Sequence, residues 1–412
     1  MGRLNGDRNK AVITGIGVVS PAGIGSEALW TALMEGRSCI KEIRQFDASS
    51  YPCRHAAEVS DLIESGLTRL ERRMLSRGGK FACSALLEAL HDARIERLEP
   101  YSTDVIIGAG HVDMNPVEDE VLSGRDILNF NPEQNAAGLL QMTISMPASF
   151  LALKSGARGH VETTSSACAS SINAISSAAA RIESGMCEIA ITGGVDTPIT
   201  RMTLNAFLKA GQLPVEYADH TRVMRPFDRD HSKSFLGEGS AILILESAEH
   251  ALARGAKIYC EVIPGRQISE NTNVLFSPDE VGESWNMMLD QLLARYEKVT
   301  CVNAHGPSDR KIDNLEARIL KNLLGARAGR VPITSVKGIT GGGMAGAASI
   351  QVAAGALMLK NRTITPIANY EFPENEFKGM NFIREPVAID GGHMLVNARG
   401  FGGILASLLL KV

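Results

Sequence analysis

A single cysteine, Cys168, stands where a predicted strand gives way to a predicted helix. The polar residues 162–166 and Ala167 precede it, and Ile172, Ile175 and Ile182 follow at helical spacing. The first turn of a helix has unpaired backbone N–H groups, which lower the pKa of a thiol and favour the thiolate. The same groups can hold a carbonyl oxygen as it becomes an oxyanion. We interpret Cys168 as a candidate nucleophile. The alternative is a small, buried apolar residue.

Two further side chains suit acid–base or electrostatic chemistry. His305 follows the apolar segment 299–303 and precedes Gly306. An imidazole at a strand end can donate a hydrogen bond or move a proton, although single histidines are often structural. Lys337 ends the predicted strand 333–337, where an ordinary strand-end lysine is the alternative interpretation.

The elements that must position these side chains alternate between strands and helices, which predicts an α/β protein. The first half of the chain has strands at 11–19, 103–110 and 188–192, the last closed by Gly193-Gly194, and helices at 27–35, 76–94 and 146–156. A helix near 250–258 joins it to a second half with strands at 258–262 and 299–303, helices at 280–296 and 314–324, and paired strands at the end. Gly15-x-Gly17 in the first strand lacks the third glycine of a dinucleotide-binding fingerprint.

Composition limits the remaining function classes. The chain has 412 residues, of which 44% are hydrophobic, enough for two domains or two closely packed halves. Its net charge is −4 without a basic block, which argues against nucleic acid as a partner. We find no signal peptide and no membrane-spanning run. The seven cysteines are scattered, without metal-ligand or disulfide spacing, so we expect no metal and a reduced, cytoplasmic enzyme.

Several motifs in order resemble the β-ketoacyl-acyl-carrier-protein synthases, the condensing enzymes of fatty acid and polyketide synthesis. The motifs are Ser166-Ala-Cys-Ala-Ser-Ser171, Arg225-Pro-Phe-Asp228, Gly237-Glu-Gly239 and Gly400-Phe-Gly-Gly403. The resemblance implies a thiolase-like five-layer α/β/α/β/α fold with two similar halves. Residues 1–255 would then carry the nucleophile, and residues 256–412 the histidine, the lysine and the glycine-rich turn.

The resemblance also implies roles for these residues. Cys168 would accept an acyl chain, and the backbone N–H groups of Cys168 and Phe401 would form the oxyanion hole. The Phe401 ring would gate the acyl pocket. Arg399, two residues before it, replaces the family's usual aromatic residue. His305 would donate a hydrogen bond to the thioester carbonyl of the malonyl group and support decarboxylation.

Three more residues take supporting roles by the same resemblance. Lys337 would act electrostatically, pairing with Glu316 and orienting the site. Asp313 and Glu316 retain the acidic positions of the histidine motif.

The chain departs from the family pattern around the expected substrate access loops. Pro307 and Asp309 replace two threonines that contact the phosphopantetheine arm, and an aspartate facing the entrance would repel phosphate. The second active-site histidine is absent, because its position falls on Gly342 or Gly343, depending on the direction of counting. Losing an acid–base imidazole costs roughly 10²–10⁴-fold in rate. Residues 232–234 replace the family's Asp-Gly-Phe.

These features predict an atypical β-ketoacyl synthase, with acyl loading from an acyl carrier protein followed by decarboxylative Claisen condensation. The resemblance implies no cofactor beyond the phosphopantetheine arm of the carrier. It also implies either a homodimer or a heterodimer with a second ketosynthase-like subunit.

Three alternatives remain open. They are a non-elongating acyltransferase or hydrolase of the same family, a partner subunit resembling a chain-length factor, and an unrelated cysteine hydrolase. The acidic segment 113–139 is either a specificity segment that caps the pocket or a solvated surface insertion.

Overall fold

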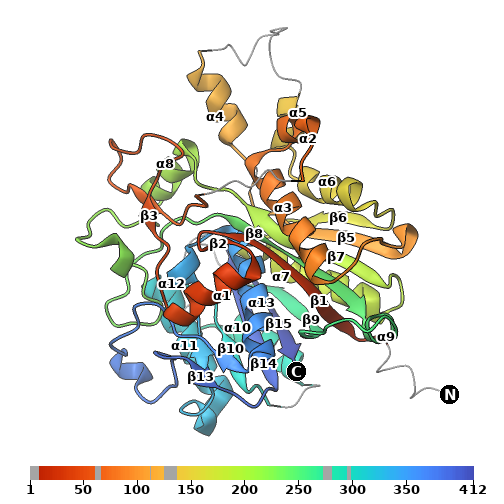
Figure 1. Cartoon of the computed structure of the whole chain (residues 1–412). Helices are drawn as coiled ribbons and strands as arrows, with labels where there is room; N and C mark the ends of the chain where they lie inside the picture. Colours follow the sequence, from red (N-terminus) through yellow and green to blue (C-terminus); the bar gives the residue numbers. More distant parts are fainter. Residues whose placement is uncertain (1–8, 61–65, 112, 125–136, 272–280, 295–297) are drawn as a thin grey trace, which may run out of the picture.

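The computed structural model describes residues 9–60, 66–111, 113–124, 137–271, 281–294 and 298–412 (Figure 1). The strands of the N-terminal half are β1 (Ala11–Ser20), β5 (Thr103–Gly108), β6 (Val161–Thr164), β7 (Ile189–Asp196) and β8 (Gly239–Ser247). Those of the C-terminal half are β9 (Cys260–Ser269), β10 (Cys301–Asn303), β11 (Ile333–Thr334), β14 (His393–Gly400) and β15 (Ile404–Lys411).

The two halves have the same sheet topology. In the first half, β8 pairs antiparallel with both β1 and β7, and β5 then pairs parallel with β7 and β6. In the second, β15 pairs antiparallel with both β9 and β14, and β10 pairs parallel with β14 and β11. The half-sheets meet where Ala11–Ile13 of β1 pairs with β9. This confirms the predicted two similar halves, while the division between residues 255 and 256 stays a prediction.

Helices form the other layers. On the outer side of the first half-sheet lie α3 (Arg77–Asp92) and α6 (Met146–Ser155). On that of the second lie α10 (Glu283–Leu293) and α11 (Arg310–Leu324). Between the half-sheets α7 (Ser170–Glu183) packs against α13 (Met344–Lys360) (Figure 1). The order α/β/α/β/α is the predicted five-layer fold of the thiolase type.

The central helix α13 follows directly from its sequence. It is rich in alanine and glycine and apolar on every side, and every residue except Lys360 is buried. A helix that is apolar all round has to be surrounded by protein. Its small side chains let α7 and both half-sheets approach closely, and its N-terminus reaches the same region as that of α7.

Several predicted boundaries differ from those in the structure. The strand expected to close at Gly193-Gly194 continues to Asp196, because Gly193 adopts a φ of +134° within β7. The strand expected at 258–262 is β9, which begins and ends later. The helix expected from 314 begins at Arg310, where Asp309 caps it. Of the helix expected at 280–296, residues 280, 295 and 296 lie outside the described residues.

The Gly15-x-Gly17 pair belongs to core packing. A Cβ atom at Gly17 would lie only 1.9 Å from the carbonyl oxygen of Ala85 in α3. The glycine therefore allows α3 to lie directly on β1.

The remaining elements connect and flank these layers. They are β2 (Gly23–Ile24), α1 (Ser26–Glu35), β3 (Lys41–Glu42), β4 (His55–Ala56), α2 (Arg69–Met74), η1 (Pro100–Ser102), α4 (Asn115–Leu122), α5 (Ala137–Met142), η2 (Ala167–Ala169), α8 (Arg201–Lys209), η3 (His220–Arg222), α9 (Ala248–Ala253), η4 (Gly325–Arg327), α12 (Lys337–Thr340), β12 (Thr363–Ile364), η5 (Asn375–Phe377) and β13 (Val387–Ala388). Of the segment 113–139, residues 125–136 lie outside the described part of the chain. Its role stays a prediction.

Candidate active site

Cys168 lies in the 3-10 turn η2, immediately before α7. Ser170 shapes this turn, since its hydroxyl accepts a hydrogen bond from Ser166 N at 2.8 Å and donates one to Ala167 O at 2.6 Å. Ala167 adopts a φ of +51°, a strained conformation that turns the next side chain out of the helix direction. The other six cysteines are buried, whereas Cys168 is partly exposed. This exposure argues against a purely structural cysteine.

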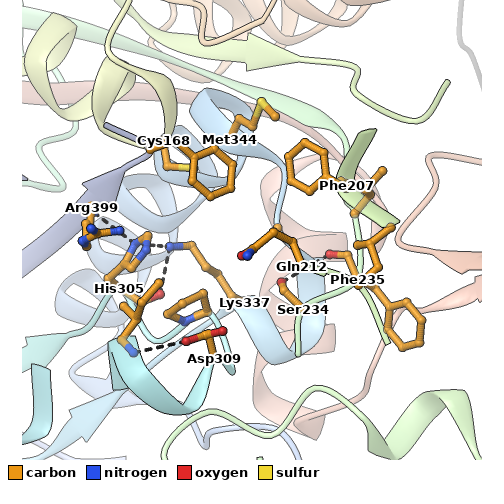
Figure 2. Close-up of a pocket in the computed structure, with 16 residues that line it drawn as sticks. Cys168, Phe207, Gln212, Ser234, Phe235, His305, Asp309, Lys337, Met344 and Arg399 are labelled. Atoms are coloured by element: carbon orange, nitrogen blue, oxygen red, sulfur yellow. Dashed lines mark hydrogen bonds between the residues drawn. The ribbon is translucent and has the colours of Figure 1, made fainter. Parts of the chain in front are cut away.

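Cys168 faces a cavity of about 70 Å³ between the two halves (Figure 2). Several residues singled out in the sequence line this cavity: Cys168, Ser234, His305, Pro307, Asp309, Lys337, Gly342, Arg399 and Phe401. Figure 2 shows His305 and Lys337 side by side on the same wall. The cavity joins residues from positions far apart in the chain.

The hydrogen bonds of His305 fix its tautomer. Its Nδ1 atom accepts hydrogen bonds from Lys337 Nζ at 2.5 Å and from the backbone N–H of Arg399 at 3.3 Å. Burial, reinforced by Lys337 and Arg399, holds the pKa of His305 well below its usual value, so the ring is neutral at pH 7. A neutral imidazole that accepts at Nδ1 carries its proton on Nε2. His305 is therefore arranged as a hydrogen-bond donor through Nε2.

Lys337 differs from the sequence expectation in two ways. It begins the short helix α12 instead of ending a strand, since β11 stops at Thr334. Its Nζ donates to Nδ1 of His305 and, at 2.8 Å, to the backbone oxygen of His305, so its hydrogen-bonding partner is His305 and not the expected Glu316. Burial lowers the pKa of Lys337 to about 8, although the charges of Cys168 and Glu316 act in the opposite direction.

The buried carboxylate of Glu316 holds the loop that carries the histidine. Its two oxygens accept hydrogen bonds from the backbone N–H groups of His305 and Gly306, each at 3.0 Å. Asn397 of β14 donates to the same carboxylate at 2.9 Å. Glu316 therefore ties α11, the histidine loop and β14 together.

Asp313 has a different set of partners. It accepts hydrogen bonds from the backbone N–H of Phe227 at 2.9 Å and from His231 at 3.0 Å. Both Asp313 and His231 are buried. Sequence reasoning did not single out His231, because nothing in its neighbourhood marks it as the partner of an aspartate 82 residues later.

The glycine-rich turn between β14 and β15 lies against the cysteine turn. A Cβ atom at Gly400 would be 2.5 Å from Ser166 O and 3.4 Å from Cys168 N. The Phe401 ring packs edge-on against Phe207 of α8, with 5.5 Å between ring centroids, and both rings line the cavity. Gly400, the residue before Phe401, thus lies directly against the backbone of the cysteine turn.

The surroundings of Cys168 oppose the low thiol pKa expected from the helix N-terminus. Burial raises its pKa, and Asp196 adds to this effect, while Lys337 and Arg399 oppose it. The helix N-terminus was predicted from local sequence, whereas the desolvation comes from the surrounding layers.

Asp196 itself was missed by the sequence reasoning. It ends β7, and burial raises its pKa to about 8. It accepts hydrogen bonds from the N–H groups of His111 at 2.9 Å and Ala345 at 2.6 Å. Its position after a buried strand was the signal available in the sequence.

The segment that should carry the second histidine packs against residues 234–237. The N–H of Gly342 donates to Phe235 O at 2.9 Å, and a Cβ atom at Gly342 would lie 2.9 Å from Ser234 Oγ. Ser234 thus occupies the space beside Gly342, and both line the cavity. Gly343 lies outside the cavity lining and directly precedes α13. His393 begins β14, at the opposite end of that strand from Arg399 and Gly400, and is not among the residues that line the cavity.

Asp309 has a structural partner as well as a place in the cavity. Its carboxylate caps α11 by accepting hydrogen bonds from the N–H groups of Lys311 at 3.0 Å and Ile312 at 3.3 Å. Repulsion of a phosphate by Asp309 stays a prediction, as does the role of Pro307.

Among the described residues, no cluster of three or more histidine, cysteine or acidic side chains is arranged to hold a metal ion. In the same part of the chain, no helix has the length and apolar character needed to span a membrane.

Two family models match most of the chain. Residues 8–251 match the model for the β-ketoacyl synthase N-terminal domain, and residues 262–371 match the model for the C-terminal domain. The chain is 33% identical over 416 residues to 3-oxoacyl-[acyl-carrier-protein] synthase 2 of a Synechocystis strain, covering 99% of each protein.

Two solved structures are similar over almost the whole length. One is a type II polyketide acyl-carrier protein in complex with its ketosynthase bound to the hexaketide. It has a TM-score of 0.88 and 26% identity, and the match covers 98% of this chain and 99% of the other. The other is the ishigamide ketosynthase/chain length factor, with a TM-score of 0.85 and 25% identity over the same shares of the two chains.

Proposed function

Because the chain belongs to the β-ketoacyl synthase family, we propose that it loads an acyl chain onto Cys168 and condenses it with a malonyl group. The observation that carries the proposal is the set of contacts in one cavity. Cys168 and His305 face the same space, and two donors occupy Nδ1 of His305. Both substrates would arrive on the phosphopantetheine arm of an acyl carrier protein.

The first half-reaction is acyl transfer. The Cys168 sulfur attacks the thioester carbonyl of the acyl carrier, and the N–H groups of Cys168 and Phe401 stabilise the oxyanion. The carrier's thiolate leaves and takes up a proton, which completes the transfer. Since burial raises the pKa of the Cys168 thiol, its thiolate depends on the nearby cations Lys337 and Arg399 and on the start of α7.

The second half-reaction is decarboxylative condensation. The Nε2–H of His305 donates a hydrogen bond to the thioester carbonyl of the malonyl group, and carbon dioxide leaves as the enolate forms. The enolate carbon attacks the acyl thioester, a carbon–carbon bond forms and the bond to Cys168 sulfur breaks. Lys337 keeps Nδ1 of His305 occupied throughout, so that the proton stays on Nε2.

Gly342 favours a second candidate, a non-elongating acyltransferase of the same family. A glycine cannot supply the second imidazole that supports the enolate. Such an enzyme would load Cys168 and then pass the acyl group to another nucleophile or to water.

The proposal includes a second ketosynthase-like chain as partner, in a homodimer or a heterodimer. Similarity to a ketosynthase/chain length factor structure supports the heterodimer as one option. A subunit with only a structural role is the third candidate, and it is disfavoured by the partly exposed Cys168.

Intact-protein mass spectrometry separates these candidates. The protein is mixed with acyl carrier protein thioesters of several chain lengths and then chased with malonyl-carrier protein, beside a Cys168→Ala control. We expect an acyl mass on the wild type only, followed by carbon dioxide release and a ketoacyl product two carbons longer.

Other results would redirect the proposal. Acylation without elongation would overturn condensation and support the acyltransferase. Absence of acylation with every donor would overturn both and leave the structural subunit, which co-purification with a second ketosynthase-like chain would then identify.

A further inference from the structure

A buried ion pair between Arg399 and Glu270 lies at the cavity that holds the candidate nucleophile. The mechanism above uses the positive charge of Arg399 and gives Glu270 no role. The guanidinium of Arg399 donates to the carboxylate of Glu270 through Nε at 3.0 and 3.1 Å and through an Nη atom at 2.7 Å. Each side chain is only 1% exposed. Arg399 also lines the cavity that holds Cys168 and His305 (Figure 2).

The pair encloses the glycine-rich turn. Arg399 is the residue immediately before the turn 400–403, and Gly403 is its last residue. The backbone N–H of Glu270 donates to Gly403 O at 2.7 Å, while its side chain holds Arg399. The end of β9 is thereby fastened to both ends of the turn that carries Phe401.

The backbone of Arg399 connects the pair to the histidine. Its N–H donates to Nδ1 of His305 at 3.3 Å, beside the hydrogen bond from Lys337. A shift of Arg399 would therefore move one of the two donors that keep the His305 proton on Nε2.

We propose that the Arg399–Glu270 pair is a positioning element of the active site, which holds the oxyanion turn and His305 in place and sets the electric field at Cys168. The inference rests on the proposed function, because it takes Cys168 as the nucleophile. A buried ion pair contributes little net folding stability compared with apolar residues of similar size. A gain in stability therefore does not explain why Arg399 and Glu270 are paired at this position.

The field acting on Cys168 comes from every element around the cavity. Lys337 on α12 and Arg399 on β14 favour the thiolate, whereas Asp196 on β7 and desolvation oppose it. His305 is neutral near pH 7 because burial holds its pKa low, and Glu270, the residue after β9, pairs with the charge of Arg399. Neutralising Glu270 thus makes the surroundings of Cys168 one charge more positive, and neutralising Arg399 makes them one charge more negative.

The test is the pH dependence of Cys168 alkylation by iodoacetamide, followed by intact mass. This reaction needs neither a carrier protein nor turnover, so its outcome is independent of whether condensation occurs. The variants are Glu270→Gln, Arg399→Met and Arg399→Lys. Cys168→Ala reports alkylation elsewhere, and Arg254→Met removes the cation of the separate Arg254–Glu246 pair as a matched control.

Glu270→Gln removes one negative charge near the cavity and should lower the alkylation midpoint by about one pH unit, the lower end of the effect of a nearby charge. Arg399→Met should raise it by a similar amount. Arg399→Lys should stay close to wild type, and Arg254→Met should not move the midpoint. Opposite shifts are the result that a purely structural pair would not produce.

Shifts of the same sign in Glu270→Gln and Arg399→Met, or no shift in a folded Glu270→Gln protein, would overturn the proposal. Thermal unfolding of each variant shows whether it is folded. If Arg399→Met does not fold, the proposal is judged by the sign of the midpoint shift in Glu270→Gln. If neither variant folds, it is judged by the alkylation midpoint of Arg399→Lys compared with that of the wild type. Arg399→Lys then has to keep the wild-type midpoint, since a midpoint displaced by a full unit would refute the electrostatic role.

Discussion

Replacing Gly400 by alanine should separate the oxyanion turn from the nucleophile turn. The added methyl group would begin 2.5 Å from Ser166 O and 3.2 Å from the Cβ atom of Ala167. An ordinary contact needs at least 3.4 Å, so the two turns have to move apart by roughly 0.9 Å. The backbone N–H of Phe401 moves with the β14–β15 turn, away from that of Cys168.

The expected cost follows from this displacement. A misplacement of about 1 Å at a reacting centre costs on the order of 10²-fold in rate, and loss of one oxyanion donor costs ~10²–10³-fold. We therefore expect Gly400→Ala to slow Cys168 acylation by roughly 10²-fold. The overpacking itself should destabilise the protein by about 1–3 kcal/mol, so the variant should still fold.

The assay is the initial rate of acyl transfer from an acyl carrier protein, measured by intact mass, together with thermal unfolding. Gly402→Ala is the matched control, because a Cβ atom there meets nothing within 4 Å, although its φ of +83° adds backbone strain. We expect the control to lose stability by ~1–2 kcal/mol and to keep acylation within about tenfold of wild type. A folded Gly400→Ala protein with wild-type acylation would refute the proposed oxyanion hole.

Three more outcomes follow from the site. In the wild type, we expect the rate of malonyl-carrier decarboxylation to fall as pH rises through about 8, where Lys337 loses its charge. Lys337→Met should lower this rate by ~10²-fold or more and abolish its fall with pH. An unchanged pH profile in the variant would contradict this. Gly342→His combined with Ser234→Gly should raise the condensation rate at least ~10-fold. The second substitution makes room, because the Ser234 hydroxyl is the first atom that a side chain added at Gly342 would meet. Ser234→Gly alone is the control, and equal rates in the two variants would argue against a missing imidazole. Glu316→Gln should lower unfolding stability by about 1–3 kcal/mol, because the amide NH₂ would face the N–H of His305 or Gly306; an unshifted Tm would show that Glu316 does not hold the loop.

Most of the fold and several candidate residues could be predicted from local signals. The turn at Cys168 follows from a polar run ahead of an amphipathic helix, and the alternation of elements predicts an α/β protein. The resemblance supplied the five layers, which the topology of the two half-sheets confirms. The ends of strands were predicted less accurately. Gly193 stays within β7, and Lys337 begins a helix, because tertiary contacts override the usual meaning of glycine and of a charged residue.

Partners within the site were harder to foresee than the residues themselves. Asp313 and Glu316 were expected to support the histidine. Glu316 binds the backbone of the histidine loop, whereas Asp313 binds Phe227 N and His231. Their partners His231 and Asn397 lie 82 and 81 residues away in the chain, a separation at which periodicity carries no information.

The sequence by itself determined the family, the order of the elements and the identity of Cys168, His305 and Lys337 as candidates, since these depend on short motifs and local backbone preferences. The tertiary structure alone decided their chemical state. Packing between the two halves shields the Cys168 thiol from water at the cavity wall, and this desolvation raises its pKa. It also brings Lys337 and the Arg399 backbone, 32 and 94 residues from His305, to the same ring nitrogen. Desolvation and the field of distant charges depend on what surrounds a group in space, and only the folded chain fixes those surroundings.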